Sequence, residues 1–148
     1  KFSEDEMSEF HRKKIGFVFQ KYNLIPMLNI KENIMLPVVL GGEQVDNAYI
    51  SELIQFLGLK ERENHLPGEL SGGQQQRVSI GRALAAKAEI LLADEPTGNL
   101  DQKTSHEIMD YFRSLNQKYN KTIIMITHDI NLAQNADDII QMVDGTIV

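Results

Sequence analysis

Hydrophobic and polar positions follow two different periods along the chain, and each period predicts a type of element. Short apolar runs bounded by polar turn residues predict strands at 15–19 ("IGFVF"), 89–94 ("EILLAD") and 122–126 ("TIIMI"). Asp144-Gly145 predicts a hairpin turn between two further strands, the first at 138–143. Apolar residues at helical spacing predict helices at 3–14, from 29 to about 57, and from about 102 to 119.

Capping residues indicate where these helices begin and end. In "LSGGQQQR" (70–77), Ser71 stands three residues before Gln74, which is the spacing of a capping box, so we predict that a helix begins there. The stretch "NIKE", which begins at residue 29, gives the same signal. We expect Pro37 to interrupt the helix that follows, and Gly58 to end it.

Strands that alternate with helices predict an α/β fold with a mostly parallel sheet. Residues 29–70 have helical patterns and no strand, so we expect them to form a separate helical subdomain. The predicted organisation has three segments: residues 1–28 with the first helix and strand, the helical subdomain 29–70, and residues 71–148 with the other strands of the core.

The composition narrows the class of protein. The 148 residues suffice for one globular domain, and 42% of them are hydrophobic. A net charge of −6 argues against electrostatic binding of nucleic acid or of an anionic membrane surface. The sequence has no cysteine, no signal peptide and no apolar run near the roughly 20 residues that span a bilayer. We therefore expect a soluble intracellular chain, and its first residue, Lys1, leaves its natural start open.

Two adjacent acids, Asp94 and Glu95, stand at the carboxyl end of the second predicted strand. Ligands of open α/β sheets bind outside the carboxyl ends of the strands. One of the acids could therefore orient Mg²⁺ and the other a water molecule. The alternative is structural, with Asp94 capping the next turn and Glu95 solvated.

Polar residues also follow the other two strands. Gln20 comes directly after the first strand and His128 after the third, so parallel strands would bring both to the edge that carries the acids. A histidine at a strand end is otherwise a surface or capping residue. The convergence of these residues at one edge, rather than any single residue, predicts a site.

The predicted helix start at Ser71 is a second candidate site. Gly72 and Gly73 have no side chains, so they leave the backbone N–H groups of the first turn uncovered. Such a helix N-terminus attracts anions, and phosphate is the commonest anion in cells.

These segments resemble the nucleotide-binding domain of ATP-binding cassette (ABC) transporters, in the family's order. "FVFQ" (17–20) is similar to the Q-loop, "LSGGQQQR" to the signature motif, 90–95 to Walker B, 98–101 to the D-loop, and His128 to the switch histidine. "IGFVFQKYNLIPMLNIKENIMLP" and "DEPTGNLD" resemble most the group that serves lipoprotein release, macrolide export and antimicrobial-peptide resistance. The resemblance implies a P-loop NTPase-like fold with an inserted helical subdomain.

The resemblance implies catalytic and metal-binding roles at the sheet edge. Asp94 would hold the Mg²⁺ shell, and Glu95 would be the general base that activates the water. Gln20 would touch Mg²⁺ or that water and would sense the membrane partner. His128 would contact the γ-phosphate of ATP.

Other matching residues would act between two subunits. Ser71, Gly72, Gly73 and Gln74 would contact the ATP that the opposite subunit holds. Asp101 would interact across the dimer. By this resemblance, the exposed N–H groups of the helix start serve a phosphate.

One motif of the family is missing from the sequence. Walker A, Gly-x-x-x-x-Gly-Lys-Ser/Thr, cradles the phosphates, and "GGEQVDN" (41–47) has the glycines without the Gly-Lys-Ser/Thr. We therefore expect the chain to match the C-terminal two-thirds of such a domain, without the Walker A strand, and to bind ATP weakly and hydrolyse none alone. Strands 122–126 and 138–143 would lose a neighbour, and their edges would favour self-association.

For the complete protein, the resemblance implies an ATPase subunit of a membrane transporter, either an exporter or a lipoprotein- or peptide-handling system, with ATP and Mg²⁺ as cofactors. The partners would be a transmembrane permease subunit, bound near residues 20–40, and a second nucleotide-binding subunit in a homodimer; no nucleic acid is expected. The protein would lie at the cytoplasmic face of the membrane as a peripheral subunit. The transported substrate is chosen by the membrane subunit and is not predicted.

Two alternatives remain open. A soluble ABC protein of translation or DNA repair is one, although such translation factors typically have "DEPTNHLD" where this chain has "DEPTGNLD". The other is a naturally truncated, non-catalytic subunit that lends its signature motif to an intact ATPase. A mere donor of that motif would need neither Glu95 nor His128.

Overall fold

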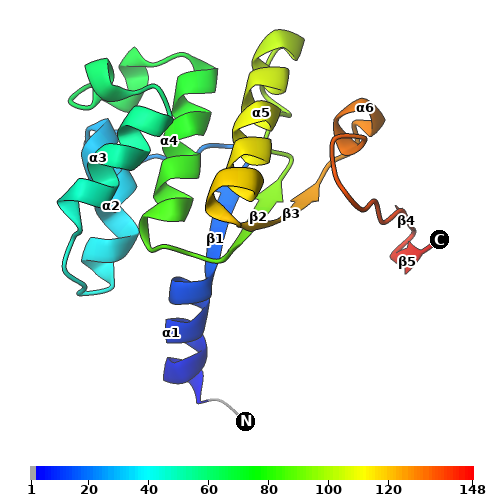
Figure 1. Cartoon of the computed structure of the whole chain (residues 1–148), viewed down its shortest axis with the longest axis horizontal. Coiled ribbons are helices and arrows are strands. Elements are labelled where there is room, and N and C mark those ends of the chain that lie inside the picture. Colours follow the sequence, from blue (N-terminus) through cyan, green and yellow to red (C-terminus); the bar gives the residue numbers. More distant parts are fainter. Residues whose placement is uncertain (1–2) are drawn as a thin grey trace.

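The computed structural model describes residues 3–148. Its helices and strands are α1 (Glu4–Lys14), β1 (Ile15–Phe19), α2 (Ile30–Leu40), α3 (Asn47–Phe56), α4 (Gly72–Ala85), β2 (Ile90–Asp94), α5 (Gln102–Tyr119), β3 (Thr122–Ile126), α6 (Ile130–Ala133), β4 (Met142–Val143) and β5 (Thr146–Ile147) (Figure 1). Two short 3₁₀ helices span Lys60–Arg62 and Pro67–Glu69. The first predicted segment, 1–28, begins with two residues that lie outside the described part of the chain. The short helix α6 is not predicted from the sequence.

The strands β1, β2 and β3 form one sheet in that order, and both neighbouring pairs are parallel. This confirms the predicted α/β fold with a parallel sheet. Strands β4 and β5 form the predicted hairpin as a separate antiparallel pair. Asp144 and Gly145 both have positive φ, 49° and 77°, as a tight hairpin turn requires. The first hairpin strand is shorter than the predicted 138–143.

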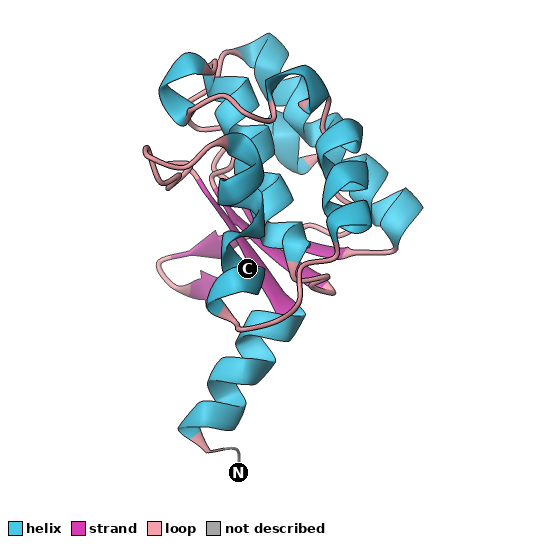
Figure 2. Ribbon diagram, turned by 90° about the vertical axis from the view of Figure 1, so that its left-hand side faces the viewer, coloured by secondary structure: helices cyan, strands magenta, loops and turns pink. Residues whose placement is uncertain are grey.

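The two faces of the parallel sheet differ in burial. One face packs against helices and includes Gly16, Val18, Leu91, Ala93, Ile123 and Met125, which form rows across the strands. Figure 2 shows most of the helices on one side of this sheet. On the other face, Phe17, Phe19, Ile124 and Ile126 are between 38% and 65% exposed. The apolar runs predict buried strands, and within the described residues this holds for one face only.

Helices α2 and α3 pack against α4 and share one hydrophobic core with it. The predicted interruption at Pro37 is wrong, because α2 continues through this residue to Leu40. Ile34 and Val38, on either side of the proline, are buried, and this packing outweighs the hydrogen bond that a proline cannot donate. The break falls after Leu40, and α3 ends before Gly58, which has the left-handed φ of 64° that the sequence predicts for a stop.

Candidate functional site

The parallel register brings the ends of the three strands to one edge of the sheet. Phe19, Asp94 and Ile126 are aligned across β1, β2 and β3. The residues that follow, including Gln20 and Glu95, therefore emerge at the same edge. This is the convergence that the sequence predicts.

Glu95 and His128 are in direct contact at this edge. The Glu95 Oε1 atom accepts hydrogen bonds from the backbone N–H of His128 at 2.9 Å and from its Nδ1 at 2.7 Å. The Thr127 hydroxyl lies 3.4 Å from Oε2 and donates to it. The Glu95 side chain is 20% exposed and that of His128 is 85% exposed. Glu95 is thus a largely covered, hydrogen-bonded carboxylate and not the solvated residue of the structural alternative.

The contact changes the acidity of the histidine. The hydrogen bond to Glu95 and the negative charge of that carboxylate raise the pKa of His128 above its ordinary value. The imidazole therefore gains a proton more readily beside Glu95, and the protonated ring, which is the exposed member of the pair, places a positive charge at the open edge of the sheet. A cation there suits an anionic ligand.

Asp94 presents a different surface. Its side chain is exposed, and it has no hydrogen-bond partner among the described residues. No group of three or more His, Cys, Asp or Glu side chains in the described part of the chain could hold a metal ion. Mg²⁺ is commonly bound by one or two carboxylates together with substrate phosphates and water. The donors at this edge, Asp94 and the amide oxygen of Gln20, fit that kind of site and not an all-protein cage.

Gln20 contacts the turn after β2 rather than Asp94 or Glu95. Its backbone carbonyl accepts from Asn99 Nδ2 at 3.0 Å, and its Nε2 donates to Asn99 Oδ1 at 3.4 Å. A Cβ on Gly98 would lie 2.5 Å from Gln20 Nε2, so a larger residue here would force the end of the Gln20 side chain to move. Gly98 and Asn99 are not singled out in the sequence as site residues, although both belong to the predicted D-loop.

The start of α4 has the predicted capping box. Ser71 Oγ accepts from the Gln74 N–H at 3.3 Å, and Gln74 Oε1 accepts from the Ser71 N–H at 2.9 Å. The glycines that follow also make room within the chain. A Cβ on Gly72 would lie 2.9 Å from the Tyr22 hydroxyl, and one on Gly73 would lie 2.4 Å from Thr104 Cγ2. The sequence argument explains these glycines by access of phosphate alone, whereas the structure adds a packing reason.

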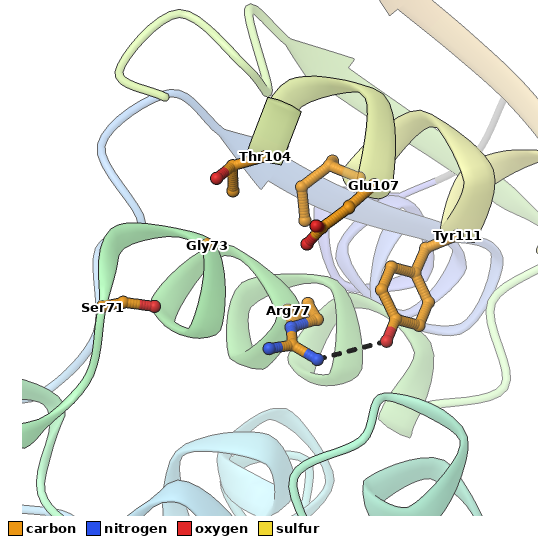
Figure 3. Close-up of a pocket in the computed structure, with 7 residues that line it drawn as sticks. Ser71, Gly73, Arg77, Thr104, Glu107 and Tyr111 are labelled. Carbon is orange, nitrogen blue, oxygen red and sulfur yellow. Dashed lines mark hydrogen bonds between the residues drawn. The ribbon is translucent and has the colours of Figure 1, made fainter. Parts of the chain in front are cut away.

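Helices α4 and α5 enclose a small cavity near their N-terminal ends (Figure 3). Its volume is about 80 Å³, and it is lined by Ser71, Gly73, Arg77, Thr104, Glu107, Ile108 and Tyr111. Arg77 closes one end by donating to the Tyr111 hydroxyl at 3.1 Å and to the Leu57 carbonyl at 2.9 Å. The cavity is too small for a nucleotide, since ligand pockets are commonly about 300 Å³ or larger.

Asp101 is the N-cap of α5. Its carboxylate accepts from the Thr104 N–H at 3.0 Å and from the Thr104 hydroxyl at 2.7 Å. These bonds, the one to the hydroxyl foremost, lower the pKa of Asp101. The same Thr104 packs against Gly73, so the predicted D-loop and the first turn of α4 meet at this residue.

Two residues of α4 that hold neighbouring segments are missed by the sequence argument. Gln76 is fully buried and donates to backbone carbonyls near the sheet edge. Arg82 donates to the carbonyls of Tyr22 and Asn23, so α4 holds the loop after β1 from its other end. The "QQQR" run after the capping box is the one sequence signal that could have drawn attention to Gln76.

Comparison with known proteins places the chain among ABC proteins. A family model described as "ABC transporter" matches residues 1–98. The uncharacterised ABC transporter ATP-binding protein MJ0796 of Methanocaldococcus jannaschii is 46% identical, over 97% of this chain and 64% of that protein. The lipoprotein-releasing system ATP-binding protein LolD of Bacteroides fragilis is 43% identical, over 98% of this chain and 68% of LolD. The macrolide export ATP-binding/permease protein MacB of Neisseria gonorrhoeae is 45% identical, over 100% of this chain and 23% of MacB.

A solved structure shares the fold. The dimeric MJ0796 cassette in a post-hydrolysis state, bound to ADP and Pi, aligns with a TM-score of 0.82 at 42% identity, over 99% of this chain and 66% of that chain. This confirms the P-loop NTPase-like fold that the motifs predict. The chain spans about two thirds of the length of MJ0796.

Proposed function

The chain belongs to the ABC transporter family, and on this premise we propose that it forms part of an ATP-hydrolysing subunit of the lipoprotein-release and macrolide-export type. The names of the relatives LolD and MacB support this subgroup. The observation that carries the proposal is the Glu95–His128 contact, a covered carboxylate bound to an imidazole at the carboxyl end of a parallel sheet. The same names favour a transporter over a soluble factor of translation or repair.

In this proposal, Glu95 is the general base for the attacking water. His128 holds Oε1 through its backbone and its ring, while Oε2 has a single long bond, to Thr127, among the described residues. Oε2 is therefore the atom that can accept a proton from water. His128, whose ring is exposed, faces the γ-phosphate with a charge that Glu95 supports.

Asp94 and Gln20 complete this side of the site as proposed ligands of the Mg²⁺ shell. The exposed carboxylate of Asp94 is free of the hydrogen bonds that occupy Glu95. Bound Mg²⁺ would neutralise charge that develops on the phosphates. Gln20, which here contacts Asn99, lies on the loop that we propose senses the membrane partner.

The signature residues act on a second subunit in this proposal. Ser71, Gly72, Gly73 and Gln74 present the N-terminus of α4, which favours anions, to the ATP held by the opposite subunit. Asp101 faces the same partner from the first turn of α5. The dimeric form of the solved MJ0796 cassette supports a homodimer.

A membrane permease is the other proposed partner. No helix in the described part of the chain is long and apolar enough to cross a bilayer. MacB carries both ATP-binding and permease functions in its name, which supports a partner of that kind for this chain. We propose a peripheral position on the cytoplasmic face of the membrane.

The substitution Glu95→Gln in the full-length protein tests the proposed base. Without the base, ATP turnover should fall by about 100- to 10,000-fold, while ATP binding is retained and the dimer persists. Glu89→Gln is a matched control, because Glu89 precedes the opposite end of β2 and pairs with Lys14. Steady-state hydrolysis and equilibrium ATP binding measure the two effects. Unchanged turnover in Glu95→Gln would refute Glu95 as the base.

The 148 residues by themselves should not hydrolyse ATP. Their sequence contains no Walker A loop, whose backbone amides and lysine neutralise the β- and γ-phosphates in P-loop proteins. Calorimetry on the isolated chain should show weak ATP binding, and a phosphate-release assay should show no turnover. A stoichiometric complex with micromolar affinity would contradict this expectation.

A further inference from the structure

Gln76 connects helix α4 to the turn after β2 and to the end of β1, although it has no role in the function proposed above. Its side chain is fully buried. Its Nε2 atom donates to the Pro96 carbonyl at 2.7 Å and to the Phe19 carbonyl at 3.4 Å. Pro96 directly follows Glu95, and Phe19 directly precedes Gln20. One amide group thus touches the backbone next to two of the proposed site residues.

The turn that Gln76 contacts has a strained backbone. Glu95 has a φ of 43°, in the left-handed region that residues with a side chain rarely adopt. Such a conformation persists only where surrounding contacts hold it. The Glu95 N–H donates to the Ile126 carbonyl at 2.9 Å, and the Gly98 N–H donates to the Glu95 carbonyl at 3.0 Å. The bond from Gln76 to the Pro96 carbonyl is a further restraint on this turn, and it comes from helix α4.

The loop after β1 is joined to the same turn. Asn99 donates to the Gln20 carbonyl at 3.0 Å, one residue beyond the Phe19 carbonyl that Gln76 contacts. Residues 19–20 and 96–99 are therefore linked by two amide side chains, one from inside the core and one from the turn itself. Any displacement of Gln20 is resisted at the backbone of the segment that carries Glu95.

The buried amide is only half satisfied. Gln76 Oε1 is buried and has no hydrogen-bond partner among the described residues. An unpaired buried acceptor lowers stability. A methionine of similar length at this position would remove the unpaired acceptor but would leave the carbonyl of the buried Pro96 without its donor, so the two effects on stability oppose each other. What the glutamine adds is a donor that joins the Pro96 and Phe19 carbonyls.

We propose that Gln76 is a positioning residue that fixes the turn carrying Glu95, and the start of the loop carrying Gln20, to the signature helix. Movement of that loop is then transmitted through Gln76 to the proposed general base. The proposal rests on the proposed function for its effect on turnover. Its effect on the two backbone segments follows from the hydrogen bonds and is independent of that function.

The substitution Gln76→Met in the full-length protein tests both effects. We expect kcat for ATP hydrolysis to fall by about tenfold, as for the loss of one positioning hydrogen bond, with little change in KM. We also expect faster amide hydrogen exchange at residues 95, 97 and 98 and at residues 19–20, while exchange in the middle of α4 is unchanged. The urea midpoint should change little, because the loss of the unpaired Oε1 is offset by the Pro96 carbonyl that is left without a donor.

Gln75→Met is the matched control for hydrogen exchange and unfolding. Gln75 is the neighbouring glutamine of α4, and its Nε2 donates at 3.2 Å to the Leu70 carbonyl, away from both segments. Its substitution should leave exchange at residues 95, 97 and 98 and at residues 19–20 unchanged.

The outcomes separate this inference from the proposed function. If the unsubstituted protein does not hydrolyse ATP, the proposed function fails, and faster exchange at the two segments in Gln76→Met still supports the inference. If exchange and kcat are both unchanged in Gln76→Met, the inference is wrong. It is also overturned if Gln76→Met lowers the urea midpoint and speeds exchange throughout the chain, since Gln76 would then support the whole core.

Discussion

The edge of the sheet at Glu95 and the first turn of α4 offer different atoms to a ligand. At the edge these atoms belong to side chains: the Glu95 carboxylate binds His128, and the Asp94 carboxylate is exposed. In the first turn of α4, Gly72 and Gly73 have no side chains, and the Ser71 side chain is used to cap the helix. The edge can thus carry out proton chemistry, whereas the helix start offers backbone N–H groups and the helix dipole.

The two regions also differ in what holds them in place. Glu95 depends on neighbours far away in the sequence, including Ile126 and His128. Ser71 and Gln74 hold each other within one helical turn. Substitutions should therefore disturb the edge through charge and backbone strain, and the helix start through packing and capping.

The largest effect on stability is expected from Gly73→Ala. The new methyl group would lie 2.4 Å from Thr104 Cγ2, and β-branched threonine cannot easily rotate away. We expect a loss of about 1–3 kcal/mol in the free energy of unfolding, measured by urea denaturation.

Two further variants sharpen this test. Thr104→Ser removes the clashing methyl but keeps a hydroxyl for Asp101, so it should recover most of the loss when combined with Gly73→Ala. Gly72→Ala should be milder than Gly73→Ala, because it meets the far end of the flexible Tyr22 side chain. Equal destabilisation by both alanines would argue against the packing explanation.

A smaller effect is expected at the edge, from the comparison of Glu95→Gly with Glu95→Ala. Both remove the carboxylate, but only glycine adopts a φ of 43° without strain. The glycine variant should therefore be more stable than the alanine variant by about 1 kcal/mol in thermal or urea unfolding, although both should lack turnover. Equal stability would mean that the turn relaxes and that its strain is not maintained.

Ser71→Ala should lower stability by a similar or smaller amount. The substitution removes the N-cap acceptor of α4, which is typically worth about 1 kcal/mol, and here the bond to Gln74 is long at 3.3 Å. Ser71→Asp keeps an acceptor and should retain the stability of the helix. Circular dichroism during urea unfolding measures both variants. An alanine variant as stable as the original would show that the cap contributes little.

The smallest effect concerns the protonation of His128. Because the pKa of His128 is raised in the folded chain, its contact with Glu95 stabilises the fold fully below the ordinary histidine pKa. That contribution is lost as the pH rises through the raised value. NMR titration of the His128 ring should show the raised pKa, and Glu95→Gln should lower it toward the ordinary value.

Local signals in the sequence predict the helices of this chain well. The capping box of Ser71 and Gln74, the stop at Gly58 and the hairpin at Asp144 depend on residues a few positions apart, and all are present in the structure. Pro37 is the exception. Its local tendency to break a helix is overcome by burial of the residues around it.

The candidate site is predicted in part. Parallel pairing of apolar strands implies that residues after each strand share an edge, and the structure brings Glu95 and His128 into contact there. The Gln20 side chain lies over Gly98 and is hydrogen-bonded to Asn99, not to either acid. The roles of these residues in catalysis remain predictions until the substitutions above are measured.

The order and type of the elements and the family motifs can be predicted from local residue patterns, because helix periods, caps and strand runs are properties of neighbouring residues. Which buried polar group connects those motifs depends on the packing of elements that are far apart in the sequence. Gln76 looks like its neighbours Gln74 and Gln75 in the sequence. Only the packing of α4 against the ends of β1 and β2 excludes water from Gln76 and sets its amide against the Phe19 and Pro96 carbonyls.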